Sequence, residues 1–206
     1  MPNNNQNLLS AQNICQALLN KSLIASIQAK EILKKKGVLK SRLEKHRNRK
    51  NASGDRNTSP VNIIDVIASL NLKSPGPDAR VIDEELIFQA LAQEWEIPFK
   101  KIDPLKLDLN LVTTTIPRSF AMKHLALPIG IKDGYLTVAT PNPFNVEVME
   151  DIARASQLKV KVVVSTKSDI VKLINEFYGF KRSITAAEHQ FSGLSVDLGN
   201  LEQYVQ

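Results

Sequence analysis

Cysteine is almost absent from this chain of 206 residues, since Cys15 is the only one. A single cysteine cannot form an internal disulfide, and such usage fits a reducing compartment. Cysteine without nearby catalytic partners most often behaves as a small buried apolar residue. We therefore expect a structural role for Cys15 and no redox chemistry.

Glycine is also scarce, and the residues that follow the glycines exclude a phosphate-binding loop. A phosphate-binding loop has the pattern GxxxxGK[ST], in which backbone amides and a lysine hold the nucleotide phosphates. None of the eight glycines is followed by lysine. We therefore expect that this chain does not hydrolyse ATP.

Residues of the types that build metal and catalytic sites are present but scattered. The candidates are His46, His124, His189, Ser119, Ser165, Ser168 and the acid pair Glu150 and Asp151. The histidines have no Cys or His at ligand spacing, the serines have no nucleophile-elbow context, and the acid pair is typical of a solvated helix face. We predict no catalytic residues, no metal and no cofactor.

Long apolar runs are missing as well. No stretch approaches the roughly 18 apolar residues of a membrane-spanning helix. The N-terminal sequence MPNNNQNLLS has neither a basic segment nor an apolar core, so we expect no signal peptide. These features predict a cytoplasmic protein that reaches a membrane only through a partner.

Residues 30–50 form the one strongly charged segment, with ten Lys or Arg residues against Glu31 and Glu44, while the rest of the chain is close to neutral. A basic segment of this kind can bind nucleic acid through phosphates or dock on an anionic lipid surface. Residues 30–60 contain no aromatic side chain, so base stacking has no platform. We treat the segment as an electrostatic docking patch made of Lys34, Lys35, Lys36, Lys40, Arg42, Lys45 and Arg47.

Apolar spacing predicts helices over the first half of the chain. Residues 7–21 suit one helix, and Ser26 can cap a second in which Ile27, Ile32 and Leu33 point inward, Gly37 is the stop and residues 39–50 are a solvated basic extension. The composition of residues 51–59 predicts a linker. Residues 60–110 predict a second hairpin, with a helix over 61–72 ended by the PGP of 75–77 and another after Asp78 or Asp83. The two hairpins share a faint repeat, Asn-Ile followed by a helical face.

The second half alternates helix and strand signals in residues 111–180. We expect a helix from Pro117, strands over 125–131 and 135–140 joined by a tight turn at Asp133-Gly134, a helix over 146–157 and a strand over 159–165. A last helix would be capped by Ser168 and ended by Gly179. The predicted fold class is α+β: an N-terminal helical subdomain followed by a small α/β subdomain with a three-stranded sheet.

Two stretches carry a family resemblance, LALPIGIKDGYLTVATPNPFNVEVMEDI and VVVSTKSDIVKLINEFYG. In their order and spacing they resemble the N-terminal domain, called MshEN, of the type II secretion and type IV pilus assembly ATPases. The resemblance extends over about residues 60–179, and more loosely over the first fifty residues. It implies a non-catalytic docking or regulatory domain that couples an ATPase motor to the cytoplasmic part of an inner-membrane protein. Residues 181–206 would then be a linker toward an ATPase domain that this chain does not include.

Some MshEN domains bind cyclic di-GMP through a motif of the form RLGxxLVxxGLL with a later Gln. The resemblance places this motif at Asn13, Ser22, Asn62, Asn71 and Gln93, where its arginine and glycine residues are replaced. We therefore expect cyclic di-GMP to bind weakly or not at all. Two alternatives to the docking domain stay open, a cyclic-dinucleotide sensor and a nucleic-acid or anionic-surface binder.

Overall fold

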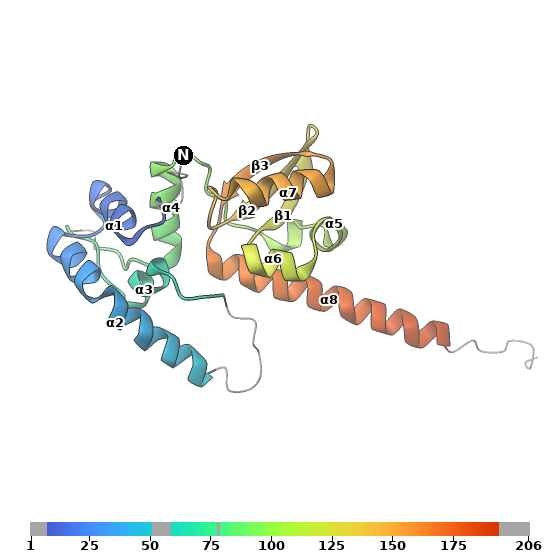
Figure 1. Cartoon of the computed structure of the whole chain (residues 1–206), viewed down its shortest axis with the longest axis horizontal. Coiled ribbons are helices and arrows are strands. Elements are labelled where there is room, and N and C mark those ends of the chain that lie inside the picture. The colour runs from blue at the N-terminus through green and yellow to red at the C-terminus, as the bar shows by residue number, and fades with distance from the viewer. Residues whose placement is uncertain (1–7, 51–58, 78, 194–206) are drawn as a thin grey trace, which may run out of the picture.

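The computed structural model describes residues 8–50, 59–77 and 79–193. Figure 1 shows four helices, α1 to α4, gathered on one side and a small sheet with its helices on the other, while α8 runs beneath the sheet and beyond it. The mixed α+β class predicted from the sequence is confirmed. The predicted linker, residues 51–59, lies outside the described residues except for Ser59.

The first hairpin consists of α1 (Ala11–Asn20) and α2 (Ser26–Lys50). Ser10 caps α1 by accepting a hydrogen bond from the Asn13 amide. The prediction that Gly37 ends the second helix is wrong, because α2 continues through it to Lys50. A glycine inside a helix costs only about 1 kcal/mol, and half-buried Leu39 and Leu43 follow it on the same helix. The prediction that Ile27 points inward is also wrong, since Ile27 is 80% exposed.

The second hairpin consists of α3 (Ile63–Ser69) and α4 (Glu84–Glu94). Asn62 and Asp65 form a reciprocal capping box at the start of α3. The PGP sequence does not end this helix, because α3 already stops before Asn71, whose φ of 48° is left-handed. Residues 75–77 lie instead in the connection from α3 to α4. An isolated antiparallel β-bridge pairs Lys73 with Val81 at the two ends of this loop. Of the two predicted caps for α4, Asp83 takes the role.

The helices of both hairpins share one core. Its buried members are Ile14, Cys15, Ala17, Leu18, Ile24, Ala29, Ile32, Ile64, Ile67, Ile82, Ile87, Phe88, Ala90, Leu91, Ala92 and Val164. Val164 comes from the last strand of the sheet, so the helical unit and the α/β unit meet at this core. Trp95, just after α4, packs edge-on against Phe144 of the α/β unit with ring centroids 5.1 Å apart.

The α/β unit begins with a 3-10 turn, η2 (Pro104–Lys106), followed by α5 (Leu109–Thr115), which the apolar spacing did not predict, and α6 (Arg118–His124). The remaining elements are β1 (Leu127–Lys132), β2 (Tyr135–Thr140), α7 (Val146–Ser156), β3 (Lys159–Val164) and α8 (Lys167–Gly193). From α6 onward this is the predicted order of helix, strand, strand, helix, strand, helix. The sheet has three strands in the order β1-β2-β3.

A tight turn at Asp133-Gly134 joins the antiparallel strands β1 and β2, as predicted. Both residues have positive φ, 52° and 76°. Two successive residues of this kind form the turn whose twist matches that of the flanking strands. The connection from β2 to β3 passes through α7 and makes that pair parallel.

A second core lies between the sheet and the helices α5 to α8. Ile102 is buried in it and Leu107 packs against it, so these two residues of the segment before α5 pack with the α/β unit. The hydroxyl group of Tyr178, on α8, donates toward the backbone carbonyl oxygens of Ile116 at 2.5 Å and Val112 at 2.9 Å. These contacts tie α8 to the end of α5.

Two predictions about α8 are wrong. Its N-terminal cap is Thr166, whose hydroxyl oxygen accepts from the Asp169 amide, rather than Ser168. The helix also passes through Gly179 and continues to Gly193, so residues 181–193 are helical. Nothing lies within 4 Å of the place where a Cβ on Gly179 would stand, so its lack of a side chain meets no steric need. Residues 194–206 lie outside the described residues.

Candidate functional site

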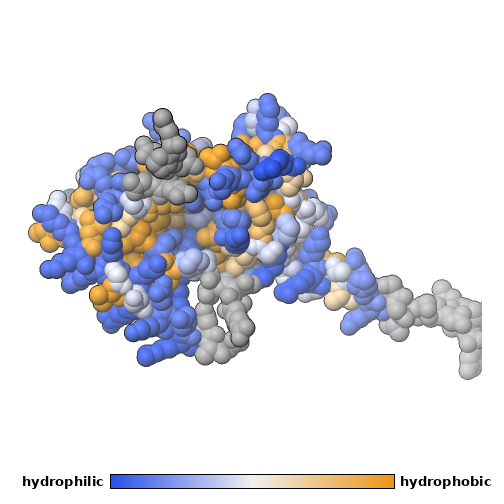
Figure 2. All heavy atoms as spheres, viewed as in Figure 1, coloured by the Kyte–Doolittle hydropathy of each residue, from blue (hydrophilic) through white to orange (hydrophobic). Residues whose placement is uncertain are grey.

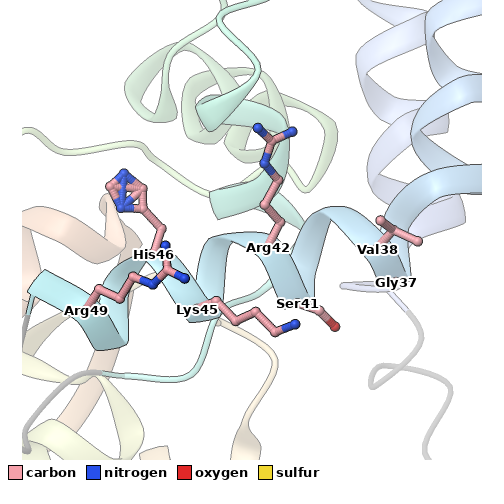
Figure 3. Close-up of a pocket in the computed structure, with 7 residues that line it drawn as sticks. All are labelled: Gly37, Val38, Ser41, Arg42, Lys45, His46 and Arg49. Atoms are coloured by element: carbon pink, nitrogen blue, oxygen red, sulfur yellow. The ribbon is translucent and has the colours of Figure 1, made fainter.

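The basic residues of the predicted docking patch lie along α2. Figure 2 shows hydrophilic atoms covering the C-terminal part of this helix. Figure 3 shows the seven residues that line a hollow of about 840 Å³ on its outer side: Gly37, Val38, Ser41, Arg42, Lys45, His46 and Arg49. All seven come from α2, so the described residues supply one wall of this hollow. Of the predicted patch, Arg42 and Lys45 belong to that wall.

Neighbouring acids on α2 partly neutralise the patch. The ammonium group of Lys35 lies 2.6 Å from the Glu31 carboxylate, and that hydrogen bond lowers the pKa of Glu31. Lys40 lies 3.9 Å from Glu44. Such exposed pairs on one helix contribute little to stability. The patch as a whole keeps its excess of positive charge.

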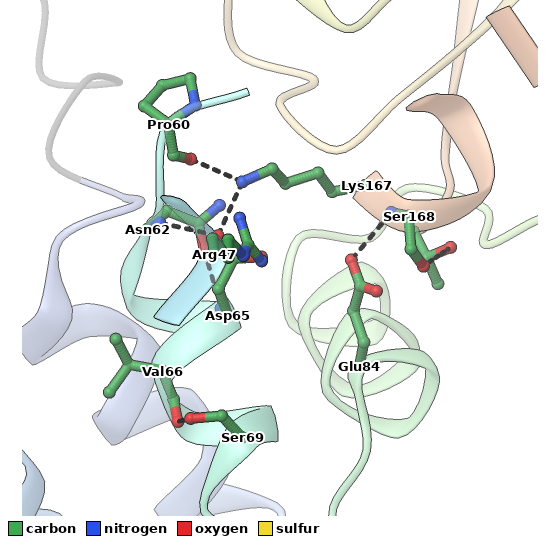
Figure 4. Close-up of polar contacts among 10 residues, drawn as sticks. Arg47, Pro60, Asn62, Asp65, Val66, Ser69, Glu84, Lys167 and Ser168 are labelled. Atoms are coloured by element: carbon green, nitrogen blue, oxygen red, sulfur yellow. Dashed lines mark hydrogen bonds and ion pairs between the residues drawn. The ribbon is translucent and has the colours of Figure 1, made fainter. Parts of the chain in front are cut away.

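Arg47 departs from the rest of the patch because it points inward. Its guanidinium lies 3.2 Å from one carboxylate oxygen of Asp65, at the start of α3. The other oxygen of Asp65 accepts from the ammonium group of Lys167 at 2.6 Å and from the Asn62 amide at 2.8 Å. We call Arg47, Asp65 and Lys167 the charged bridge (Figure 4).

The charged bridge connects the two units of the chain. The Lys167 and Asp65 side chains are only 6% and 7% exposed, and they belong to α8 and α3. Lys167 also donates to the Pro60 carbonyl oxygen at 2.6 Å. Because burying a charge without partners is costly, these contacts hold the start of α8 against α3 in a defined position.

A second polar contact supports the same junction. The Ser168 amide, in the first turn of α8, donates to the Glu84 carboxylate on α4 at 3.1 Å. A carboxylate at a helix N-terminus is stabilised by the free amides and by the helix dipole. A hollow of about 390 Å³ opens beside these residues, lined by Arg47, Ser59, Asp65, Glu84, Lys167, Ser168, Val171 and Lys172.

A smaller hollow on the other side of α2 is mainly apolar. It measures about 200 Å³ and is lined by Gln28, Glu31, Ile32, Lys35, Leu39, Leu70 and Leu72. Leu70 and Leu72 flank the left-handed residue Asn71, so the turn that ends α3 supplies one wall and α2 the other. We call this hollow the α2 groove.

The five positions considered for a dinucleotide do not line any of the three hollows described above. Ser22 and Asn71 both have left-handed backbones, with φ of 53° and 48°, at equivalent turns after α1 and α3. Asn62 uses its side chain in the capping box of α3, and Gln93 lies exposed on α4. Asn13 lies exposed on α1, separated from Ser22 by most of that helix.

Three further observations concern Cys15, possible metal sites and possible membrane-spanning helices. Cys15 is buried, and burial raises the pKa of its thiol, which fits the structural role predicted for it. Within residues 8–50, 59–77 and 79–193, no group of three or more His, Cys, Asp or Glu residues is arranged to hold a metal ion. Among the helices that the structure describes, none combines the length and the apolar composition needed to cross a membrane.

Sequence reasoning missed the charged bridge and the identity of the groove residues. Lys167 stands in the polar run STKSD, and Asp65 occupies an ordinary capping position, 102 residues away. No local pattern indicates that these two residues meet. A lysine or an aspartate at the start of a helix is commonly exposed to solvent, so neither residue type indicates a buried pair.

Comparison with known proteins confirms the resemblance predicted from the sequence. Residues 95–184 match the MshEN domain family. The chain is 23% identical over 124 residues to the type IV pilus assembly ATPase TfpB of Acinetobacter baylyi, an alignment that covers 60% of this chain and 21% of that protein. All five positions considered for a dinucleotide lie outside the part that matches the family model.

Two solved structures are similar to this chain. The structure of MshE with cdg has a TM-score of 0.52 and 18% identity, and the alignment covers 80% of this chain and 98% of that one, which shows a shared fold. The N-terminal domain of XpsE has a TM-score of 0.48 and 16% identity, with 81% and 94% of the two chains covered. The chain therefore spans about a fifth of the curated pilus relative and nearly all of these shorter structures.

Proposed function

We propose, from the premise that residues 95–184 match the MshEN family, that this chain is the non-catalytic docking and regulatory domain of a secretion or pilus assembly ATPase. In this role it attaches the motor to the cytoplasmic part of an inner-membrane protein. The observation that carries the proposal is the family match, together with the similarity to a pilus assembly ATPase over 60% of the chain.

The geometry supports a docking role in two ways. The basic face of α2 is exposed, and charge of one sign speeds the encounter with an acidic partner. The charged bridge holds α3 against the start of α8, so a force applied to the helical unit is transmitted to the α/β unit through buried contacts. A domain that relays movement needs such a connection.

Binding to the cytoplasmic domain of the inner-membrane secretion or pilus protein from the same organism tests this proposal. We expect the whole chain to bind this domain when the domain is immobilised on a surface and the association and dissociation rates are measured. Replacing Lys34, Lys35 and Lys36 by Gln should lower the association rate several-fold at low salt and less at high salt. A matched control replaces Lys123, Lys132 and Lys172, which are exposed on the α/β unit, by Gln. Absence of binding by the unaltered chain would refute the docking role.

The same proposal assigns ATP hydrolysis to another part of the parent protein. The sequence contains no GxxxxGK[ST] loop, so we expect neither ATP turnover nor ATP affinity from this chain. Isothermal calorimetry checks this expectation. Binding of ATP at micromolar concentration would contradict it.

A cyclic di-GMP sensor is the second candidate. MshE, whose fold this chain shares, was solved with cdg, and Ser22 and Asn71 have the left-handed backbone that favours glycine at the two motif positions. The motif's arginine residues are nevertheless replaced here. We expect no saturable rise in melting temperature with cyclic di-GMP at low micromolar concentration. Such a rise would favour the sensor over the docking domain.

A further inference from the structure

The size of the α2 groove restricts what can fill it. Its volume is about 200 Å³. Pockets for drug-sized ligands measure roughly 300–1,000 Å³, whereas an apolar cavity of about 150 Å³ already holds a benzene ring. The groove therefore fits one or two large apolar side chains and is too small for a dinucleotide.

Four of the seven residues that line the groove are apolar, two from α2 and two from the turn that ends α3. Ile32 forms the floor and is only 2% exposed. Leu39, Leu70 and Leu72 are half-buried, and each presents part of its side chain to the hollow. From Ile32 to Leu39 the helix rises about 10 Å, or two turns. This length matches two turns of an incoming helix laid alongside α2.

The surface around the groove is positively charged. Glu31 and Lys35 both line the groove and pair with each other, so they nearly cancel, while exposed Lys30, Lys34, Lys36 and Lys40 on the same stretch of α2 leave an excess of positive charge beside it. An incoming segment rich in Lys or Arg would meet like charges, which oppose association. An acidic segment gains from the same charges, so charge complementarity selects among apolar helices.

We propose that the α2 groove is a docking site for an acidic amphipathic helix of a partner protein, which inserts leucine-like side chains between α2 and the turn that ends α3. This inference rests on the proposed docking function and specifies the chemistry of the partner segment. The apolar anchor supplies affinity and the lysines supply orientation and association rate.

A designed peptide that stands in for the partner's helix tests the groove. This probe is a fluorescein-labelled Glu/Ala helical peptide of about 18 residues with two leucines, at i and i+7, on one face. One control peptide has serine in place of leucine, and another has lysine in place of glutamate. We expect the first peptide to shift the amide resonances of Ile32, Lys35 and Leu72 in a saturable manner, and neither control to do so. Binding by the lysine peptide, or shifts confined to another surface, would overturn the proposal.

Groove variants sharpen this test. Leu39→Gln keeps the helix propensity of α2 while making one wall polar, and Leu72→Glu places a negative charge on the opposite wall. We expect each to weaken binding of the acidic peptide by at least about tenfold, as loss of a leucine-sized contact implies. The matched control is Leu105→Glu, since Leu105 is 94% exposed on the α/β unit. Melting temperatures establish that the variants are folded, and unchanged peptide affinity in a folded Leu39→Gln protein would refute the groove assignment.

The same variants separate this inference from the proposed function. If the inner-membrane partner binds and Leu39→Gln leaves its affinity unchanged, the groove assignment fails while the docking function stands. If the partner does not bind but the acidic peptide occupies the groove, the docking function fails and the chemistry of the groove stands.

Discussion

At the scale of single residues, the charged bridge joins α3 to the start of α8 through buried side chains. Lys167 donates from its ammonium group to Asp65 and to the Pro60 carbonyl oxygen, and Arg47 contacts the other oxygen of Asp65. A buried pair of this kind adds little over an apolar replacement of both partners, but removal of one partner leaves a buried charge with the full desolvation cost. The main effect of the bridge is the position that it imposes on α8.

We expect Lys167→Met to lower the free energy of unfolding by about 3 kcal/mol, the lower end of the range for breaking a buried pair. The loss is not larger because Arg47 and the Asn62 amide still contact Asp65. Urea unfolding measures it. Lys172→Met is the control, since Lys172 is exposed and its pair with Glu176 spans 3.9 Å. A loss below about 1 kcal/mol, the contribution of an exposed pair, would show that the bridge contributes little.

Tyr178 gives a second prediction at this scale. Burial raises its pKa from 10.0 to about 12. The unfolded chain, with the ordinary value, releases the phenolic proton first, so the free energy of unfolding falls as the pH rises from about 10 toward 12. We expect Tyr178→Phe to remove this part of the pH dependence. Chemical unfolding at several alkaline pH values checks it, and an equally steep decline in the variant would contradict the assignment.

At the scale of elements, the energetic effect of replacing a glycine depends on the backbone conformation at that position. Gly37 and Gly179 lie inside α2 and α8, and nothing stands within 4 Å of the place where a Cβ would be built. Gly134 has equally open surroundings but a φ of 76° in the turn between β1 and β2. The backbone conformation, rather than the available space, therefore decides what a side chain costs.

We expect Gly37→Ala to stabilise the protein by about 0.5–1 kcal/mol, because alanine loses less conformational entropy in a helix. Gly134→Ala is the comparison variant, and it should destabilise the protein by about 1–2 kcal/mol because alanine is strained in a left-handed backbone conformation. Thermal unfolding of the two variants beside the unaltered chain measures both changes. Destabilisation by Gly37→Ala would mean that α2 bends or breaks at that residue.

At the scale of the whole molecule, the two cores meet at one junction. Val164 belongs to the core of the helical unit although it ends β3, and the charged bridge, the Glu84–Ser168 contact and the Trp95–Phe144 pair all lie along the same boundary. Several contacts of different chemistry therefore oppose separation of the units. This arrangement suits a domain through which movement is relayed.

The junction predicts cooperative unfolding. Trp95 is the only tryptophan, so its fluorescence reports on this boundary. We expect fluorescence and far-ultraviolet circular dichroism to give the same urea midpoint in the unaltered chain, as two-state unfolding requires. In Lys167→Met the fluorescence midpoint should shift at least as far as the dichroism midpoint. Separate midpoints in the unaltered chain would show that the units unfold independently.

The sequence by itself determined most elements of the α/β unit and the hairpins of the helical unit. Asp133-Gly134 encodes its turn locally, and Asp83 and the β-branched run of β3 act through short-range preferences. These signals extend over a few residues, and the structure agrees with them. The family resemblance likewise rests on the order of such local elements, which is why the sequence alone displays it.

Only the tertiary structure decided where α2 and α8 end and which residues meet across the junction. Gly37 and Gly179 are weak local stop signals, and packing of α2 on α3 and of Tyr178 on α5 outweighs a cost of about 1 kcal/mol. The pairing of Asp65 with Lys167 and the α2 groove depend on segments far apart in the chain. Their positions follow from how the two cores pack, and periodicity along one segment carries no information about that packing.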